Sequence, residues 1–335
     1  MKTPIFMHMA DGLISVPIGL LFLMISFVAI GVSIKKINET HDESKIPMMA
    51  VMGAFVFVMQ MINFTIPGTG SSGHIGGGIL LCLVLGQYPA FLSLCSVLII
   101  QCLFFGDGGL LALGCNMFNM GVIPCFLAYP FIVKPLLKNK LNSKNIVIAS
   151  ILGVVIGLEL GAFCVVLETL MSQITELPFI AFVSLMLPIH LAIGLVEGLI
   201  TAAVVSYVYK ESSSMIDHAL MNQSFAKINY KKLFSVFIVL TIFVGGGLSL
   251  YASSHPDGLE WSIGGITGDS EIEAKGEVKE ALSKVQETTA FLPDYNFSRS
   301  ESNLGVSTSG IVGGAITLIA IGTIGYIASK KNKNE

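Results

Sequence analysis

The chain has 335 residues, of which 53% are hydrophobic and 12% are charged, about half the charged share of an ordinary soluble domain. This composition excludes a water-soluble globular protein, and a net charge of −3 without any aromatic-interleaved basic patch argues against a nucleic-acid partner. The long apolar stretches predict an all-α, polytopic membrane helical bundle whose apolar side chains face lipid.

Nine apolar runs lie along the chain, and each is predicted to form one helix. The criterion is length, because a spanning helix needs roughly 20 mainly apolar residues. The runs cover residues 13–34, 46–63, 75–87, 89–105, 108–135, 145–171, 177–208, 233–251 and 309–328. The third and fourth runs are short, and the turn Gly86–Pro89 between them fits either two tilted helices or a re-entrant pair.

Lysines predict the orientation of these helices. Nine alternating crossings collect most lysines on one side, which the positive-inside rule makes cytoplasmic. The outer side then holds the N-terminus, the loops 64–74 and 106–109 and the acidic segment 252–308, while the C-terminus is cytoplasmic. We therefore expect a multi-pass protein of the cell membrane.

A charged stretch at 209–232 predicts the domain organisation. It separates a seven-helix domain, residues 7–208, from a two-helix module, residues 233–328. The stretch itself is expected to be a cytoplasmic linker. The hairpin of the second module would carry the extracytoplasmic segment 252–308.

Two histidines on the predicted outer side are candidate metal ligands. His8 follows Met7, and His74 closes a glycine-rich loop. If the mature chain begins at Met7, its amine, the deprotonated His8 amide nitrogen and a His8 ring nitrogen would chelate one ion through fused five- and six-membered rings. A His74 nitrogen could complete a square plane, which favours Ni(II) or Cu(II). The alternative is structural, with His8 at the membrane interface and His74 bonded to backbone.

Three further polar residues are candidates for supporting roles. Asp11 would either cap the first helix or orient an imidazole. Asn116 and Asn119 lie three residues apart on one face of a predicted helix. Such amides usually hydrogen-bond across helices, and the alternative is contact with the substrate or the outer loop.

His190 and Glu197 stand seven residues apart, hence on one face of the seventh predicted helix. Ionisable groups within a membrane helix suggest a function, although an internal pair or an interfacial position would also explain them. The sequence contains none of the usual motifs of hydrolases, metalloproteases or nucleotide-binding enzymes. An enzyme is therefore not expected.

These motifs, in this order, resemble the CbiM and NikM family, the metal-specific membrane subunits of energy-coupling-factor transporters for cobalt and nickel. The resemblance covers about residues 7–208. Its segments are Met7–Gly12, Gly73-His74, Phe105–Gly109, Gly114–Gly121 and His190–Glu197. It implies that Met7, His8 and His74 bind the transported ion in a square plane.

The second module resembles the NikN-type partner of nickel systems, through His255–Trp261 and Leu292–Tyr295. This fused arrangement favours nickel over cobalt. The family implies a transmembrane coupling protein and ATP-binding subunits as partners, Ni²⁺ or Co²⁺ as the transported substrate, and no cofactor. The alternative is a self-sufficient channel or secondary carrier, which would need a continuous polar path that scattered Asn, His and Glu residues do not obviously supply.

The sequence departs from the family at its start. Residues 1–6 precede Met7 and would remove the free amine that the chelate needs. We therefore expect them to be absent from the functional protein, either because translation starts at Met7 or because a peptidase removes them.

Overall fold

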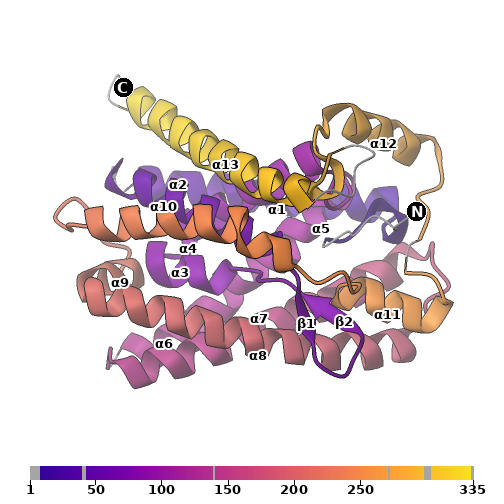
Figure 1. Ribbon diagram of the computed structural model, residues 1–335, viewed down its shortest axis with the longest axis horizontal. Helices are drawn as coiled ribbons and strands as arrows, with labels where there is room; N and C mark the ends of the chain where they lie inside the picture. The colour runs from indigo at the N-terminus through magenta and orange to yellow at the C-terminus, as the bar shows by residue number, and fades with distance from the viewer. Residues whose placement is uncertain (1–7, 40–42, 139, 271, 298–302, 333–335) are drawn as a thin grey trace.

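The computed structural model describes residues 8–39, 43–138, 140–270, 272–297 and 303–332. Most of its helices lie roughly along the long axis of the molecule (Figure 1). In the first part of the chain these are α1 (Val16–Asn38), α2 (Ile46–Gln60), α3 (Gly78–Leu85), α4 (Gln87–Ile100), α5 (Leu113–Met117), α6 (Lys134–Lys138), α7 (Ser143–Ser172) and α8 (Phe179–Glu211). They are followed by α9 (Ser213–Leu220), α10 (Lys231–Gly246), α11 (Gly258–Thr267), α12 (Glu277–Thr289) and α13 (Asn303–Asn332).

Shorter elements connect these helices. The 3₁₀-helices are η1 (Asp11–Leu13), η2 (Glu43–Lys45), η5 (Leu248–Tyr251) and η6 (Pro293–Tyr295). Two π-helices continue other helices: η3 (Gln101–Phe105) extends α4, and η4 (Phe118–Val133) joins α5 to α6. Strands β1 (Phe64–Ile66) and β2 (Ser71–Gly73) form an antiparallel hairpin.

All nine apolar runs are helical, which confirms the prediction of an all-α, polytopic membrane bundle. Within the described residues, seven helical stretches are long and apolar enough to cross a membrane. They are Val16–Asn38, Gln87–Phe105, Leu113–Lys138, Ser143–Ser172, Phe179–Glu211, Lys231–Tyr251 and Leu304–Tyr326.

The other two runs form the short helices α2 and α3, of 15 and 8 residues. All of α3 and nearly all of α2 is buried inside the protein. A helix that is apolar all round is either lipid-facing or surrounded by protein, and these two are surrounded. Gly86, with φ of 87°, makes the turn from α3 into α4.

The two-helix module packs directly on the first domain. Both α10 and α13 contact α2 and each other. Gly245 and Gly310 face one another where α10 and α13 cross, and neither position has space for a Cβ without moving the other helix. Small residues let membrane helices approach this closely.

Figure 1 shows that the two ends of the bundle differ. The β1–β2 hairpin, α11 and α12 gather at one end, whereas α6 and α9 lie at the other. Helices α9, α11 and α12 fall in segments for which no helix was predicted, because their sequences carry no membrane-length apolar run. Helices α11 and α12 of the acidic segment thus lie at the end opposite α6, which carries Lys134 and Lys138.

Candidate metal centre

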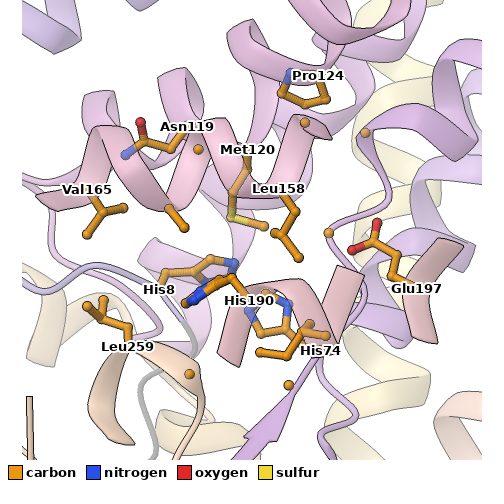
Figure 2. Close-up of a pocket in the computed structure, with 18 of the residues that line it drawn as sticks. His8, His74, Asn119, Met120, Pro124, Leu158, Val165, His190, Glu197 and Leu259 are labelled. Carbon is orange, nitrogen blue, oxygen red and sulfur yellow. The ribbon is translucent and has the colours of Figure 1, made fainter. Parts of the chain in front are cut away.

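His8 and His74 lie side by side in the interior of the hairpin end. The centroids of their imidazole rings are 5.3 Å apart, with the ring planes inclined at 63°. His8 is 4% exposed, and both residues line one cavity (Figure 2). The folded chain thus brings together two candidate ligands that are 66 residues apart in sequence. Met7, the third, lies outside the described residues.

The β1–β2 hairpin and α8 position His74. Strand β2 ends at Gly73, directly before His74, and Gly73 pairs with Phe64 of β1. A Cβ on Gly73 would lie 2.5 Å from Cγ1 of Ile193 on α8, so only glycine allows the hairpin to pack this closely. After His74 the chain turns at Gly77, with φ of 78°, and enters α3.

Asn116 on α5 holds the segment that carries His8. Its side-chain oxygen accepts a hydrogen bond from the backbone N–H of Met9 at 3.0 Å, and its Nδ2 donates to the Met9 carbonyl at 3.1 Å. The N–H of Gly109 donates to the same carbonyl at 3.0 Å. Asn116 thus contacts the N-terminal segment, which neither of the two interpretations left open for it had named.

Asp11 and Asn119 have other partners. The Asp11 carboxylate accepts a hydrogen bond at 2.9 Å from the N–H of Ala112, the residue before α5, and no described contact joins it to an imidazole. Burial raises the pKa of Asp11. Asn119 lines the cavity and donates to the Glu168 carboxylate at 2.8 Å, which is the cross-helix bond expected of an intramembrane amide.

Asp107 contacts the imidazole of His8, a role that the sequence did not indicate. Its Oδ2 lies 2.9 Å from His8 Nδ1, and both side chains are about 1% exposed. The Tyr295 hydroxyl donates to the same oxygen at 2.6 Å. The flanking glycines 106, 108 and 109 were the available signal, because they let this loop approach the His8 segment closely.

The pairing with Asp107 constrains how His8 can bind an ion. A chelate through the His8 amide nitrogen closes a six-membered ring only with Nδ1. In the structure Nδ1 faces Asp107 Oδ2 at 2.9 Å, although this contact lacks the geometry of a hydrogen bond. Chelation therefore requires the imidazole to turn about its Cβ–Cγ bond or to separate from Asp107.

The second module closes over the loop that precedes His74. The Ser72 N–H donates to the Pro256 carbonyl at 2.8 Å, and the Trp261 Nε1 donates to the Thr69 carbonyl at 3.0 Å. Asp257 begins α11 with a capping box, accepting from the N–H of Glu260 at 2.8 Å. Burial raises the pKa of Asp257 to about 7. The second module is thus part of the cavity wall.

His190 and Glu197 both line the cavity from α8, but they do not pair with each other. His190 Nδ1 lies 2.7 Å from the Met186 carbonyl oxygen. The Glu197 Oε1 accepts from the Gly77 N–H at 2.9 Å. The suggestion of an internal pair is therefore wrong, and Figure 2 shows both side chains at the cavity.

The cavity has a volume of about 110 Å³ and is lined by the His8 segment, the His74 loop, α3, α5, η4, α7, α8 and the start of α11. No group of three or more His, Cys, Asp or Glu side chains suited to a metal occurs among the described residues. The predicted square plane does not need one, since two of its four nitrogens belong to the main chain. Side chains supply only two imidazoles, and these are the two that meet here.

Comparison with known families gives two matches along the chain. Residues 8–215 match the CbiM family, described as the cobalt uptake substrate-specific transmembrane region. Residues 231–330 match the PDGLE domain.

Similar proteins include transport proteins of archaea. A putative fused nickel transport protein NikMN of Archaeoglobus fulgidus is 29% identical over 93% of this chain and 96% of the relative. A putative metal transport protein of Methanocaldococcus jannaschii is 34% identical over 61% of this chain and 92% of the relative. A crystal structure of a transition metal transporter superposes with a TM-score of 0.55 at 32% identity, covering 62% of this chain and 94% of that one.

Proposed function

The chain belongs to the CbiM family, and on that premise we propose that it captures a nickel or cobalt ion and imports it across the membrane. Its relatives are nickel, cobalt and metal transport proteins, and its helices are those of a multi-pass membrane protein. The ion is the transported substrate. The protein is a transport subunit and not an enzyme.

The observation that carries this proposal is the meeting of His8 and His74 in a buried cavity, with ring centroids 5.3 Å apart. Two imidazoles at this separation can both reach one ion, because metal–nitrogen bonds are about 2 Å long. The remaining donors are the amine of Met7 and the amide nitrogen of His8, in a chain that starts at Met7. Four nitrogens in a plane favour Ni(II) over the harder divalent ions. Fused relatives of this chain are named nickel transport proteins, so we favour nickel over cobalt.

The second module is proposed to keep the capture site assembled. Its Tyr295 hydroxyl bonds Asp107, which contacts His8, and its Trp261 bonds the loop before His74. The second module thus contacts groups that adjoin both candidate ligands, His8 and His74. The two family matches, over residues 8–215 and 231–330, support a proposed division into a capture domain at 7–208, a cytoplasmic linker at 209–232 and a two-helix module at 233–328 with its extracytoplasmic segment 252–308.

Transport is proposed to be driven by other polypeptides. The sequence contains no nucleotide-binding loop, so ATP hydrolysis would come from ATP-binding subunits acting through a transmembrane coupling protein. The hairpin end with its acidic segment is assigned to the extracytoplasmic side, and the lysine-rich end to the cytoplasm. A self-sufficient carrier would instead transport the ion without any ATPase.

The test is equilibrium dialysis of purified protein against radioactive nickel, with cobalt as competitor. The full chain beginning at Met7 should bind one ion, and His74→Ala should abolish this binding. His255→Ala is the matched control, because His255 is an exposed histidine of the second module whose carbonyl, not its ring, bonds the His74 loop. Equal binding by wild type and His74→Ala would refute the proposed site.

The start of the chain is tested in the same assay. Protein that retains residues 1–6 has no free amine at Met7 and should bind nickel more weakly than protein beginning at Met7. Intact-mass measurement of the active protein identifies which form is functional. Strong binding by a chain that retains Lys2 would show that the amine is not a ligand.

A further inference from the structure

Glu197 is a buried carboxylate in the middle of α8. It is the nineteenth of the 33 residues of that helix and is 3% exposed. One carboxylate oxygen, Oε1, accepts the hydrogen bond from the Gly77 N–H. The other, Oε2, has no hydrogen-bond partner among the described residues. A carboxylate buried at this depth is costly, and half of this one is unused by the fold.

The unpartnered oxygen belongs to the same cavity as the capture site. Glu197, His8 and His74 all line it, and none of its described lining residues is Lys or Arg. Gly76 packs against this carboxylate, since a Cβ added there would lie 3.4 Å from Oε2. The described wall therefore provides no lysine or arginine as a positive partner for this carboxyl group. A divalent cation would supply that partner.

His190 also lines the cavity from α8, two helical turns before Glu197. Its Nδ1 contacts the Met186 carbonyl oxygen, which can only accept, so Nδ1 carries the proton. In the neutral ring the lone pair is then on Nε2. Metal-binding histidines are commonly oriented by such a bond from their other ring nitrogen to a carbonyl. Figure 2 shows His190 beside His8 and His74, with Glu197 further along the cavity.

The spacing along α8 shows toward which end of the helix Glu197 lies from His190. Glu197 follows His190 by seven residues, which is two helical turns or about 10 Å along the helix axis. Helix α8 continues from Glu197 to Lys210, at the end that we assign to the cytoplasm. Glu197 is therefore displaced from the capture site toward the side where the ion must be released.

Resting on the proposed function, we propose that Glu197 is a transit site for the divalent cation, which its Oε2 binds after the ion leaves His8 and His74 and passes His190. A single carboxylate oxygen binds Ni²⁺ or Co²⁺ more weakly than a four-nitrogen plane does. Weak, sequential binding suits a transit site, because an ion held too strongly cannot leave. The carboxylate also offsets the cost of placing a divalent cation inside the bilayer.

Glu197→Gln separates this role from a structural one. The glutamine oxygen can still accept the Gly77 N–H, so the contact with the start of α3 is kept while the negative charge is removed. Glu159→Gln is the matched control, because Glu159 is another glutamate of a membrane helix, on α7, and does not line the cavity. Glu197→Asp keeps the charge on a shorter side chain and should restore part of the activity.

Two measurements are needed, both on the full chain. Dialysis against radioactive nickel reports capture, and uptake of radioactive nickel by cells that express the chain with its transporter subunits reports passage. For Glu197→Gln we expect capture to be unchanged and uptake to fall by roughly tenfold or more, as when a group that supports a metal site is lost. Glu159→Gln should match wild type in both.

The outcomes separate the two proposals. Normal uptake by Glu197→Gln, or an equal loss in Glu159→Gln, would overturn the transit site while leaving capture intact. Loss of nickel binding by Glu197→Gln in dialysis would also overturn it, because Glu197 would then belong to the capture site. Absence of nickel binding by the wild-type chain would refute the proposed function and the transit site with it.

Discussion

Replacing Gly108 with alanine tests whether the loop 106–109 positions the capture site. Gly108 has φ of 78°, a conformation that costs an alanine about 1–2 kcal/mol. Its added Cβ would lie 2.9 Å from both the His8 Cβ and the Asn116 Nδ2. Overpacking of this kind costs about 1–3 kcal/mol more. Because Asn116 holds the Met9 backbone, relief of the contact should move His8.

Gly68→Ala is the control for Gly108→Ala. Gly68 has the same φ of 78°, lies in the turn of the β1–β2 hairpin, and has nothing within 4 Å of an added Cβ. Both variants should therefore lose similar stability from backbone strain. Only Gly108→Ala has the additional 1–3 kcal/mol of close contact, which corresponds to roughly 5- to 150-fold weaker nickel binding if it is relieved by moving His8.

The assay compares nickel dissociation constants by dialysis for protein that elutes as a single folded species. Apparent melting temperatures of the metal-free variants measure the shared strain. Nickel binding by Gly108→Ala that equals binding by Gly68→Ala would show that the position of His8 does not depend on this loop. Equal weakening in both variants would attribute the effect to backbone strain alone.

Two further predictions concern stability. Burial raises the pKa of Asp257 from 3.8 to about 7. Between these pH values the native state retains a proton that the unfolded chain releases. The contribution of Asp257 to the free energy of unfolding therefore falls as the pH rises from about 4 to about 7. Asp257→Asn keeps the helix cap but cannot ionise, so its melting temperature relative to wild type should increase from about pH 5 to about pH 8; a constant difference would contradict this. Gly310→Ala should destabilise the protein by about 1–3 kcal/mol, because the new Cβ meets the Gly245 backbone. Gly31→Ala, with nothing within 4 Å, should be neutral or slightly stabilising, and equal thermal shifts in the two variants would refute the close crossing of α10 and α13.

The helices of this protein could be predicted from sequence because membrane insertion depends on a local property, the length of an apolar run. All nine runs are helical. The length of an apolar run did not reveal that α2 and α3 are surrounded by protein. The sequence of a helix that is apolar on all sides does not distinguish lipid from protein surroundings. Helices α9, α11 and α12 were also missed, because they carry no membrane-length run.

The candidate ligands were visible in the sequence, whereas their surroundings were not. His8 and His74 stood out because each adjoins a distinctive local motif, and in the structure both line one cavity. The contact of His8 with Asp107, and of Asp107 with Tyr295, joins segments about 100 and 190 residues apart, and no local pattern encodes such pairs. Composition and run length fix which segments enter the membrane. The close packing of glycine-bearing loops and helices determines which polar groups then face one another.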